Sequence, residues 1–354
     1  MESTIGMRIL ITGICGFVGS TLADALASKY EIIGIDNLCR RGSEKNVDVL
    51  KKTGVHVVIG DVKNQNDLAS LPKVDWVIDA AANPSVLAGA DGKTTSRALV
   101  EDNLEGTLEI LEYCKTWNAG LILLSTSRVY SLHSLMSLPL QKKDQRFVLN
   151  AGESFLGLSD RGICEQFPTE PPLSLYGSSK LASEVMALEY GSTFDFPVYV
   201  NRCGVLAGAG QFGKGDQGIF SFWIHSYARK KPLQYFGFGG YQTRDCLHPR
   251  DLVLLLEKQM QNSDTDLPRV VNVGGGARNS ASLLELSDWC EKEFGKHEIK
   301  IDSEKRKFDV PWLILDSSLA EATWGWSVQT SLESIFEEIA CYAETHPHWL
   351  EACS

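Results

Sequence analysis

The sequence predicts an α/β fold in which a doubly wound parallel sheet is followed by a smaller lobe of mixed structure. The prediction depends first on five continuous apolar runs of strand length, at residues 8–12, 31–36, 55–61, 75–82 and 120–126. Helical segments such as 100–115 lie between some of these runs. Runs that are apolar on both faces indicate strands covered on both sides, as in a parallel sheet. Alternation of such strands with helices is typical of a Rossmann sheet, which carries helices on each face.

The elements can be followed from the first strand onward. Residues 8–29 (RILITGICGFVGSTLADALASK) combine a β-branched run, a glycine turn and a helix whose apolar face includes Leu22 and Leu26. Residues 131–174 contain prolines and no clean period, so we expect an irregular insertion over the carboxyl edge of the sheet. The apolar segment 196–205 predicts a sixth strand of the same sheet.

The second half of the chain is less regular and predicts the small lobe. Its parts are a glycine-rich stretch at 206–218, a helical segment at 219–230, an apolar run at 270–275, a helix at 282–295 and a final helix near 331–344. We therefore expect a sheet domain over 1–205 and a lobe over 206–354, with some segments of the second half returning to the sheet domain.

Composition excludes several classes of partner. A formal net charge of −11 argues against binding to nucleic acid or to an anionic membrane, which need clustered Lys and Arg. The start of the chain has no secretory pattern, and no apolar run approaches the ~18 residues of a membrane span, so we expect a cytoplasmic protein. Nine scattered cysteines without paired spacing indicate reduced thiols and no metal site.

The turn after the first strand carries Gly13-x-x-Gly16-x-x-Gly19. Glycines at this place let the backbone turn tightly and approach a pyrophosphate, whose charge meets free N–H groups at the start of the helix. A glycine triplet alone is weak evidence because glycine is common in loops. Between a strand and a helix it predicts a dinucleotide site.

Asp36 closes the second strand, where a carboxylate can accept hydrogen bonds from the ribose hydroxyls of a dinucleotide and repel a 2′-phosphate. This placement favours NAD over NADP. Arg40 and Arg41 follow closely, so a 2′-phosphate pocket stays open as an alternative. Asp61 and Val62, after the third strand, could hold the adenine, although a plain strand-end aspartate is an equally good interpretation.

Tyr176 and Lys180 lie four residues apart in LYGSSKLASEV, at the start of a predicted helix. Positions i and i+4 share one helix face, so an ammonium beside the phenol would lower the pKa of the phenol and make it a usable base. The alternative is a solvated surface pair. The dinucleotide turn, together with Thr126 at a strand end, favours the proton-handling interpretation.

These features together resemble the extended short-chain dehydrogenase/reductase family, which contains NAD-dependent nucleotide-sugar epimerases and dehydratases. The resemblance includes G-x-x-G-x-x-G, LSTSRVY and Y-x-x-x-K, and it spans nearly the whole chain. Later segments, among them NRCGVLAG, QFGKGDQG and GFGGYQTRDCLHPRDL, resemble the branch of the family that epimerises CDP-sugars at C2.

The resemblance implies three sets of site residues. The catalytic set is Thr126, Tyr176 and Lys180. The NAD set is Gly13, Gly16, Phe17, Val18, Gly19, Asp36, Asn37, Asp61, Val62, Ala80, Ala81, Asn103, Tyr176 and Lys180. The substrate set is Asn83, Ser127, Arg128, Gln217, Arg244 and Arg306. Ala207 and Pro311 depart from the pattern, because many relatives have a tyrosine at the first position and a second arginine near the other.

The implied activity is inversion of one sugar carbon by transient oxidation and hydride return, with a nucleotide-sugar as substrate and a homodimer as the assembly. CDP and C2 are favoured by the branch, while the base, the sugar and the carbon stay open. A dehydratase is disfavoured because dehydrating relatives carry Asp-Glu directly after the threonine, where this chain has Ser127 and Arg128. A net reductase and a non-catalytic NAD(P)-sensing protein are the remaining alternatives.

Overall fold

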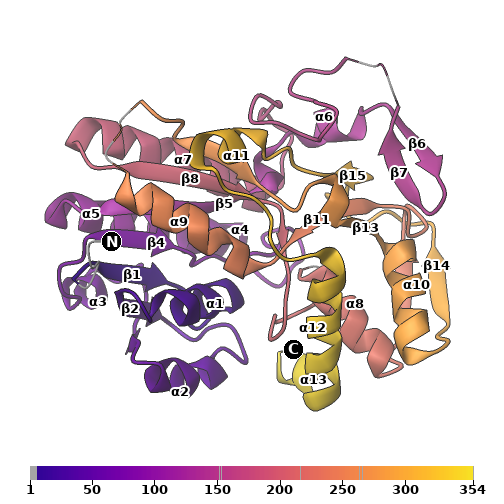
Figure 1. The fold of residues 1–354 in the computed structure, drawn as a ribbon, viewed down its shortest axis with the longest axis horizontal. Helices are drawn as coiled ribbons and strands as arrows, with labels where there is room; N and C mark the ends of the chain where they lie inside the picture. Colours follow the sequence, from indigo (N-terminus) through magenta and orange to yellow (C-terminus); the bar gives the residue numbers. More distant parts are fainter. Residues whose placement is uncertain are drawn as a thin grey trace.

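A seven-stranded parallel sheet forms the centre of the larger part of the molecule (Figure 1). The computed structural model describes residues 6–150, 152, 154–215, 217–262, 264 and 266–353. The strands in spatial order are β12 (Val270–Val273), β8 (Val198–Cys203), β5 (Gly120–Thr126), β4 (Trp76–Asp79), β1 (Arg8–Thr12), β2 (Glu31–Asp36) and β3 (His56–Ile59). The order reverses at β1, as expected for a doubly wound sheet, so the predicted fold class is confirmed.

Alternate residues of each strand supply two separate cores. Ile9 and Ile11 of β1 belong to the core under α1 (Phe17–Leu26), α2 (Glu44–Lys52), α9 (Leu252–Gln261) and α11 (Ser318–Trp324). Leu10 points to the opposite core, under α3 (Gln65–Ala69), α5 (Gly106–Trp117) and α7 (Leu175–Phe194). This period of two explains why the strand sequences are apolar throughout, because both faces are covered.

The prediction for residues 270–275 was wrong in one respect. We assigned this apolar run to the small lobe, whereas β12 pairs with β8 in the main sheet, with Val270 opposite Val200. A buried strand shows its length and hydrophobicity in the sequence, but nothing local identifies the strand with which it pairs.

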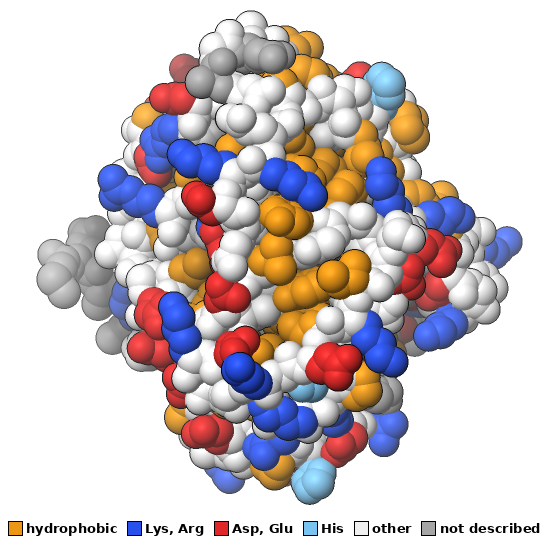
Figure 2. Space-filling model, turned by 90° about the vertical axis from the view of Figure 1, so that its right-hand side faces the viewer, with side chains coloured by type: hydrophobic (Ala, Val, Ile, Leu, Met, Phe, Trp, Pro, Cys, Tyr) orange, Lys and Arg blue, Asp and Glu red, His pale blue; other side chains and the backbone are white. Residues whose placement is uncertain are grey.

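The remaining strands form small sheets on the other side of the molecule. Strands β10 (Leu233–Phe236) and β14 (Ile299–Asp302) pair in parallel. Strand β11 (Thr243–Leu247) pairs with β9 (Val205–Leu206), β13 (Ser280–Ser282) and β15 (Trp312–Leu313). Helices α8 (Ile219–Ala228), α10 (Leu283–Phe294) and α12 (Leu332–Thr345) share a hydrophobic core with them, and the short α13 (Trp349–Ala352) follows α12. Figure 2 views this side and shows hydrophobic side chains gathered in the middle of the face, with charged side chains mostly around them.

The segment 131–174 is more ordered than the sequence predicted. It contains α6 (Leu132–Met136) and an antiparallel hairpin of β6 (Leu140–Lys143) and β7 (Arg146–Leu149). Each strand of this hairpin has only four residues; β6 is mostly polar and exposed, and β7 is mostly apolar but only half-buried, so neither stands out as a strand in the sequence. The hairpin contacts the small lobe through the Arg146 guanidinium, which pairs with the Glu285 carboxylate at 2.6 Å.

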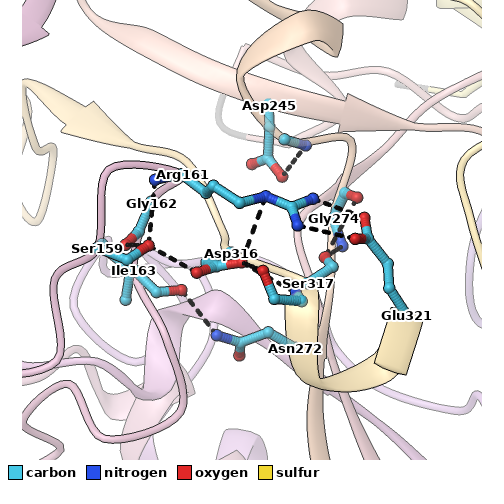
Figure 3. Close-up of polar contacts among 12 residues, drawn as sticks. Ser159, Arg161, Gly162, Ile163, Asp245, Asn272, Gly274, Asp316, Ser317 and Glu321 are labelled. Carbon is cyan, nitrogen blue, oxygen red and sulfur yellow. Dashed lines mark hydrogen bonds and ion pairs between the residues drawn. The ribbon is translucent and has the colours of Figure 1, made fainter. Parts of the chain in front are cut away.

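A polar network ties the second part of this segment to the main sheet (Figure 3). Arg161 pairs with Glu321 of α11 at 2.7 Å, and the Ser159 hydroxyl donates to Asp316 at 2.6 Å. The Asn272 amide of β12 donates to the carbonyl of Ile163 at 2.8 Å. The insertion is therefore anchored at several points to elements far away in the sequence.

Short helices complete the described structure: α4 (Ser96–Val100), which continues through a π-helical stretch at Glu101–Glu105 into α5, and the 3₁₀ turns Ser127–Val129, Pro249–Asp251 and Ala277–Asn279. Within the described ranges, every helix is either too short or too polar to cross a bilayer.

Candidate active site

The glycine turn between β1 and α1 has the geometry of an anion site. Gly13 has φ +61°, and a Cβ there would lie 2.9 Å from the Cα of Ala81, so only glycine fits. Gly19 packs against the turn, since its Cβ would lie 2.3 Å from the carbonyl oxygen of Gly13. Gly16 caps α1 without a side-chain hydrogen bond, which leaves the first N–H groups of the helix, those of Phe17, Val18 and Gly19, for an anion.

Asp36 lies at the end of β2, beside this turn. Its two carboxylate oxygens accept hydrogen bonds from the backbone N–H groups of Cys15 (2.9 Å) and Leu38 (2.8 Å). Burial raises the pKa of this carboxyl, and the backbone donors oppose the effect. An ionised carboxylate has about four lone-pair sites, so Asp36 keeps acceptor capacity for hydroxyl groups.

The other predicted dinucleotide positions line the carboxyl edge of the neighbouring strands. The Asn37 amide donates to the Asp61 carboxylate at 3.0 Å, and Val62 packs over Gly106 of α5. The Thr12 hydroxyl accepts hydrogen bonds from the N–H groups of Ala80 (3.1 Å) and Ala81 (3.0 Å). It also donates to Asp79 at 2.6 Å. Sequence reasoning missed Thr12 and Asp79, although both lie at strand ends.

An aromatic cluster packs against the start of α1, directly after the glycine turn. Phe17, at the start of α1, packs with Phe212, Trp349 and Cys353, all of which are buried. The Phe212 and Trp349 rings stack at 5.4 Å, and the Trp349 indole donates to the carbonyl of Gln211 at 2.9 Å. Arg40 donates to the carbonyl of Phe212. The C-terminal helix is thus joined to the loop that follows β2.

Thr126, Tyr176 and Lys180 meet at the carboxyl end of β5. Thr126 is the last residue of that strand, and its hydroxyl is hydrogen-bonded to the phenol of Tyr176. Tyr176 and Lys180 lie one turn apart on α7 and are 8% and 2% exposed. The surface interpretation of this pair is therefore wrong.

The electrostatics of the pair differ from expectation. Burial raises the pKa of Tyr176, while the Thr126 hydroxyl and the Arg128 charge oppose that rise. Burial lowers the pKa of Lys180, and the carboxylates of Asp79 and Glu184 oppose it. We expected Lys180 to make the phenol more acidic, but in this structure desolvation dominates both groups.

A buried ion pair supports α7 from below. The Glu184 carboxylate lies one turn after Lys180 and pairs with the Arg202 guanidinium of β8 at 2.7 Å. It also accepts a hydrogen bond from Ser125, the neighbour of Thr126. The sequence signal for Glu184 is its spacing, because it repeats the four-residue step from Tyr176 to Lys180.

Asn103 connects α7 with the loop after β4. It is buried in the π-helical stretch, where its amide donates to the Ser179 hydroxyl at 3.1 Å and its carbonyl oxygen accepts from the N–H of Asn83 at 2.8 Å. The structure therefore places Asn103 as a tie between two segments that flank the predicted cofactor position.

A cavity of about 310 Å³ adjoins the trio through Arg128, which lines the cavity and whose backbone N–H donates to the Thr126 hydroxyl oxygen. Its lining includes Arg128, Arg244 and Arg306, as predicted, together with Asp309. The other lining residues are Val86, Leu87, Gly215, Ile219, Phe220, Phe222, Trp223, Pro232, Leu233, Gln234, Phe236, Gln242, Ala281, Leu283, Lys307 and Phe308. Among the described residues, none from 131–174 lines it.

Arg244 and Arg306 are held by different contacts. Arg244 donates to Asp309 at 2.8 Å and to the carbonyls of Thr243 and Val310, and burial lowers its pKa to about 10. Arg306 donates to the carbonyl of Gly215 and lies 4.0 Å from the centre of the Phe236 ring.

Three members of the predicted substrate set lie outside the cavity wall. Asn83 is bound to Asn103, Ser127 is buried at the start of its 3₁₀ turn, and the backbone of Gln217 pairs with Lys214.

Comparison with known proteins agrees with this geometry. The pattern of the NAD dependent epimerase/dehydratase family matches residues 9–274. The chain is 32% identical over 306 residues to CDP-paratose 2-epimerase of Salmonella typhi, which covers 80% of this chain and 85% of that protein. It is 26% identical over 328 residues to a putative UDP-glucose 4-epimerase of Methanocaldococcus jannaschii, covering 92% of this chain and 94% of that relative.

Among solved structures, UDP-glucuronic acid 4-epimerase of Bacillus cereus, in complex with UDP-glucuronic acid and NAD, superposes with a TM-score of 0.78 at 26% identity. The superposition covers 96% of this chain and 99% of that one. The family match over most of the chain, the shared fold and the dinucleotide turn lead to one conclusion: this chain belongs to the NAD dependent epimerase/dehydratase family of nucleotide-sugar enzymes, within the extended short-chain dehydrogenases/reductases.

Proposed function

We propose that this protein epimerises a nucleotide-diphosphate sugar, with a CDP-sugar as substrate and C2 as the inverted carbon. One observation carries the reaction type: Tyr176, hydrogen-bonded to Thr126, lies at the same edge of the sheet as the glycine turn and next to the arginine-lined cavity. The base and the carbon are supported by the similarity to the Salmonella typhi CDP-paratose 2-epimerase. Similarity to UDP-sugar epimerases makes UDP the alternative to test.

The glycine turn fits NAD. Gly13 leaves room that any Cβ would fill, α1 offers unpaired N–H groups to a pyrophosphate, and Asp36 can accept from ribose hydroxyls. Asp61 and Val62 would hold the adenine end, and Lys180 the nicotinamide ribose. When bound, NAD supplies reversible hydride uptake, which side chains alone cannot provide.

The trio moves the proton. The phenolate of Tyr176 takes the proton of the sugar hydroxyl and later returns it, while the Thr126 hydroxyl holds the same oxygen in place. Asp79 and Glu184 favour the charged form of Lys180 against the effect of burial. The transient keto-sugar turns in the pocket, so that hydride would return to its opposite face and invert the configuration of that carbon.

The cavity charges suit a diphosphate. Arg244, Arg306 and the exposed Lys307 face one carboxylate, Asp309, which leaves two positive charges. A nucleotide-diphosphate sugar carries two negative charges on its diphosphate. The aromatic rings of the lining supply flat surfaces for the base and the sugar.

The test is to incubate the purified protein and NAD with CDP-, UDP-, GDP- and dTDP-sugars and to assign products by NMR. A product that differs only in configuration at one carbon, without net NADH, establishes epimerisation and identifies base and carbon. Loss of water or consumption of added NADPH would instead support a dehydratase or a reductase. Tyr176→Phe should lose activity, while Tyr190→Phe, near the other end of the same helix, should retain it.

We further propose a homodimer formed through α5 and α7. The two helices pack side by side and expose Trp117 (37%), Val185 (60%) and Phe194 (40%). Val185→Glu should produce monomers in analytical ultracentrifugation, while Val49→Glu, at an equally exposed position on α2, should not. A wild-type monomer would refute this assembly.

The nine free cysteines, all within the described residues, support a reducing compartment such as the cytoplasm.

A further inference from the structure

We propose that Arg128 is a further catalytic residue, whose guanidinium binds the substrate oxygen beside Tyr176 and stabilises the negative charge that the two oxygens share as the proton moves. The inference rests on the proposed function and deepens it. It concerns the sugar end of the cavity, whereas Arg244 and Arg306 would hold the diphosphate.

The backbone of Arg128 is fixed against the reacting residues. Arg128 lies in the 3₁₀ turn directly after β5, and its N–H donates to the Thr126 hydroxyl oxygen at 3.2 Å. The first turn of α7 rests on the same residue, because a Cβ on Gly177 would lie 2.2 Å from the carbonyl oxygen of Arg128. Gly177 directly follows Tyr176, so Arg128 is held next to both the threonine and the tyrosine.

The side chain of Arg128 keeps donors for a ligand. It reaches into the cavity, where Nη1 donates to the carbonyl of Phe308 at 3.2 Å, and within the described part of the chain this is its one hydrogen bond to protein. A guanidinium has five N–H donors. By contrast, Arg244 is bound to two carbonyls and to Asp309.

The charges around the pair agree with this role. The groups that act on Tyr176 are Arg128 from the turn, Thr126 from β5 and Cys203 from β8. Lys180 lies one turn further along the same helix. Arg128 opposes the rise in the pKa of Tyr176, and Tyr176 and Asp309 in turn oppose the fall that burial causes in the pKa of Arg128. Among the described arginines lining the cavity, Arg128 is the one with this effect on the phenol.

The experiment compares Arg128→Met with Arg306→Met, a matched change at another cavity arginine. Two readouts need no turnover: the ultraviolet titration of Tyr176 in the NAD-bound protein, taken as the difference from Tyr176→Phe, and the affinity for CDP by calorimetry. Arg128→Met should raise the titration midpoint of Tyr176 by about one pH unit, as expected when a neighbouring opposite charge is lost. It should lower kcat by about 10²-fold, as for loss of an oxyanion donor, and leave CDP affinity unchanged.

Arg306→Met should do the reverse, weakening CDP binding without moving the tyrosine titration. Arg128→Lys, which keeps the charge and loses the fork, should restore the midpoint and part of kcat, and this rescue separates the role of Arg128 from a folding defect. The proposal is overturned if Arg128→Met weakens CDP binding and leaves the titration unchanged. Absence of epimerisation by the wild-type protein would refute the proposed function without altering either of these readouts.

Discussion

Replacing Gly177 with alanine separates helix propensity from the fit of the active site. Gly177 lies in the first turn of α7, where alanine would favour the helix by about 1 kcal/mol. The added Cβ, however, would lie 2.2 Å from the carbonyl oxygen of Arg128. The obstacle is backbone, which follows β5 directly and is hydrogen-bonded to Thr126, so it cannot swing aside as a side chain would.

The magnitude follows from this distance. Ordinary contact begins at 3.4 Å, so the start of α7 would have to move by about 1.2 Å, the difference between 3.4 and 2.2 Å. A misplacement of about 1 Å can cost about 10²-fold in rate, and Tyr176 moves with the helix. Overpacking of this kind costs about 1–3 kcal/mol, which exceeds the gain in helix propensity.

We therefore expect Gly177→Ala to lower kcat about 10²-fold and to reduce the free energy of unfolding by up to about 2 kcal/mol. The assays are NMR-monitored turnover on the substrate found in the panel and urea denaturation. Ser178→Ala is the matched control, since Ser178 is the next residue and is exposed, and it should remain active and at least as stable. An active Gly177→Ala protein with increased stability would show that the contact relaxes freely and would refute the reasoning.

Three other predictions follow from buried groups. Glu184→Gln should lower the free energy of unfolding by about 3–5 kcal/mol because it leaves Arg202 charged and buried. In urea denaturation, adding Arg202→Met to this variant should restore part of the lost stability. Strictly additive effects of the two substitutions would contradict the pairing. Burial raises the pKa of Asp245 to about 7, so the native state holds this proton more tightly than the unfolded chain, and the free energy of unfolding falls as pH rises from about 4 through 7. The urea midpoint of the wild type should therefore fall relative to that of Asp245→Asn between pH 5 and 8. Midpoints of the two proteins that change in parallel with pH would contradict this. Trp349→Ala should speed NAD dissociation about tenfold in stopped-flow measurements because it opens the aromatic cluster. Trp117→Ala, at an exposed tryptophan, should leave the dissociation rate unchanged. Equal dissociation rates for the two variants would exclude a role for the cluster.

Local spacing carried much of the fold prediction. The glycine turn, the strand before it and the Tyr176–Lys180 step are patterns within a few residues, and all of them occur where the sequence predicts. Pairing between distant segments was less accessible. The placement of β12 beside β8, and of the β6–β7 hairpin beside Glu285 of α10, depends on partners far along the chain, so local hydrophobicity could not identify it. The domain boundary at residue 205 stays a prediction.

The site shows the same division. Arg128, Arg244 and Arg306 were predicted from the family resemblance. The carboxylate that binds Arg244, that of Asp309, is far away in the sequence and is identified only in the folded chain. The ion pair of Glu184 with Arg202 likewise joins a helix to a strand. The pKa of Tyr176 could not be predicted from spacing because it depends on how completely the folded chain removes water from the phenol.

The aromatic cluster around Phe17 and Trp349 also has a consequence for folding during synthesis on the ribosome. Phe17, which directly follows Gly16 of the glycine turn, is made early, yet the Trp349 ring in its cluster belongs to α13, which is translated after almost all of the other described residues. At about 5–20 residues per second, the nascent chain exposes Phe17 for many seconds before Trp349 emerges. A chain truncated before Trp349 would therefore yield a protein whose sheet can form but in which Phe17, next to the glycine turn, lacks this packing partner.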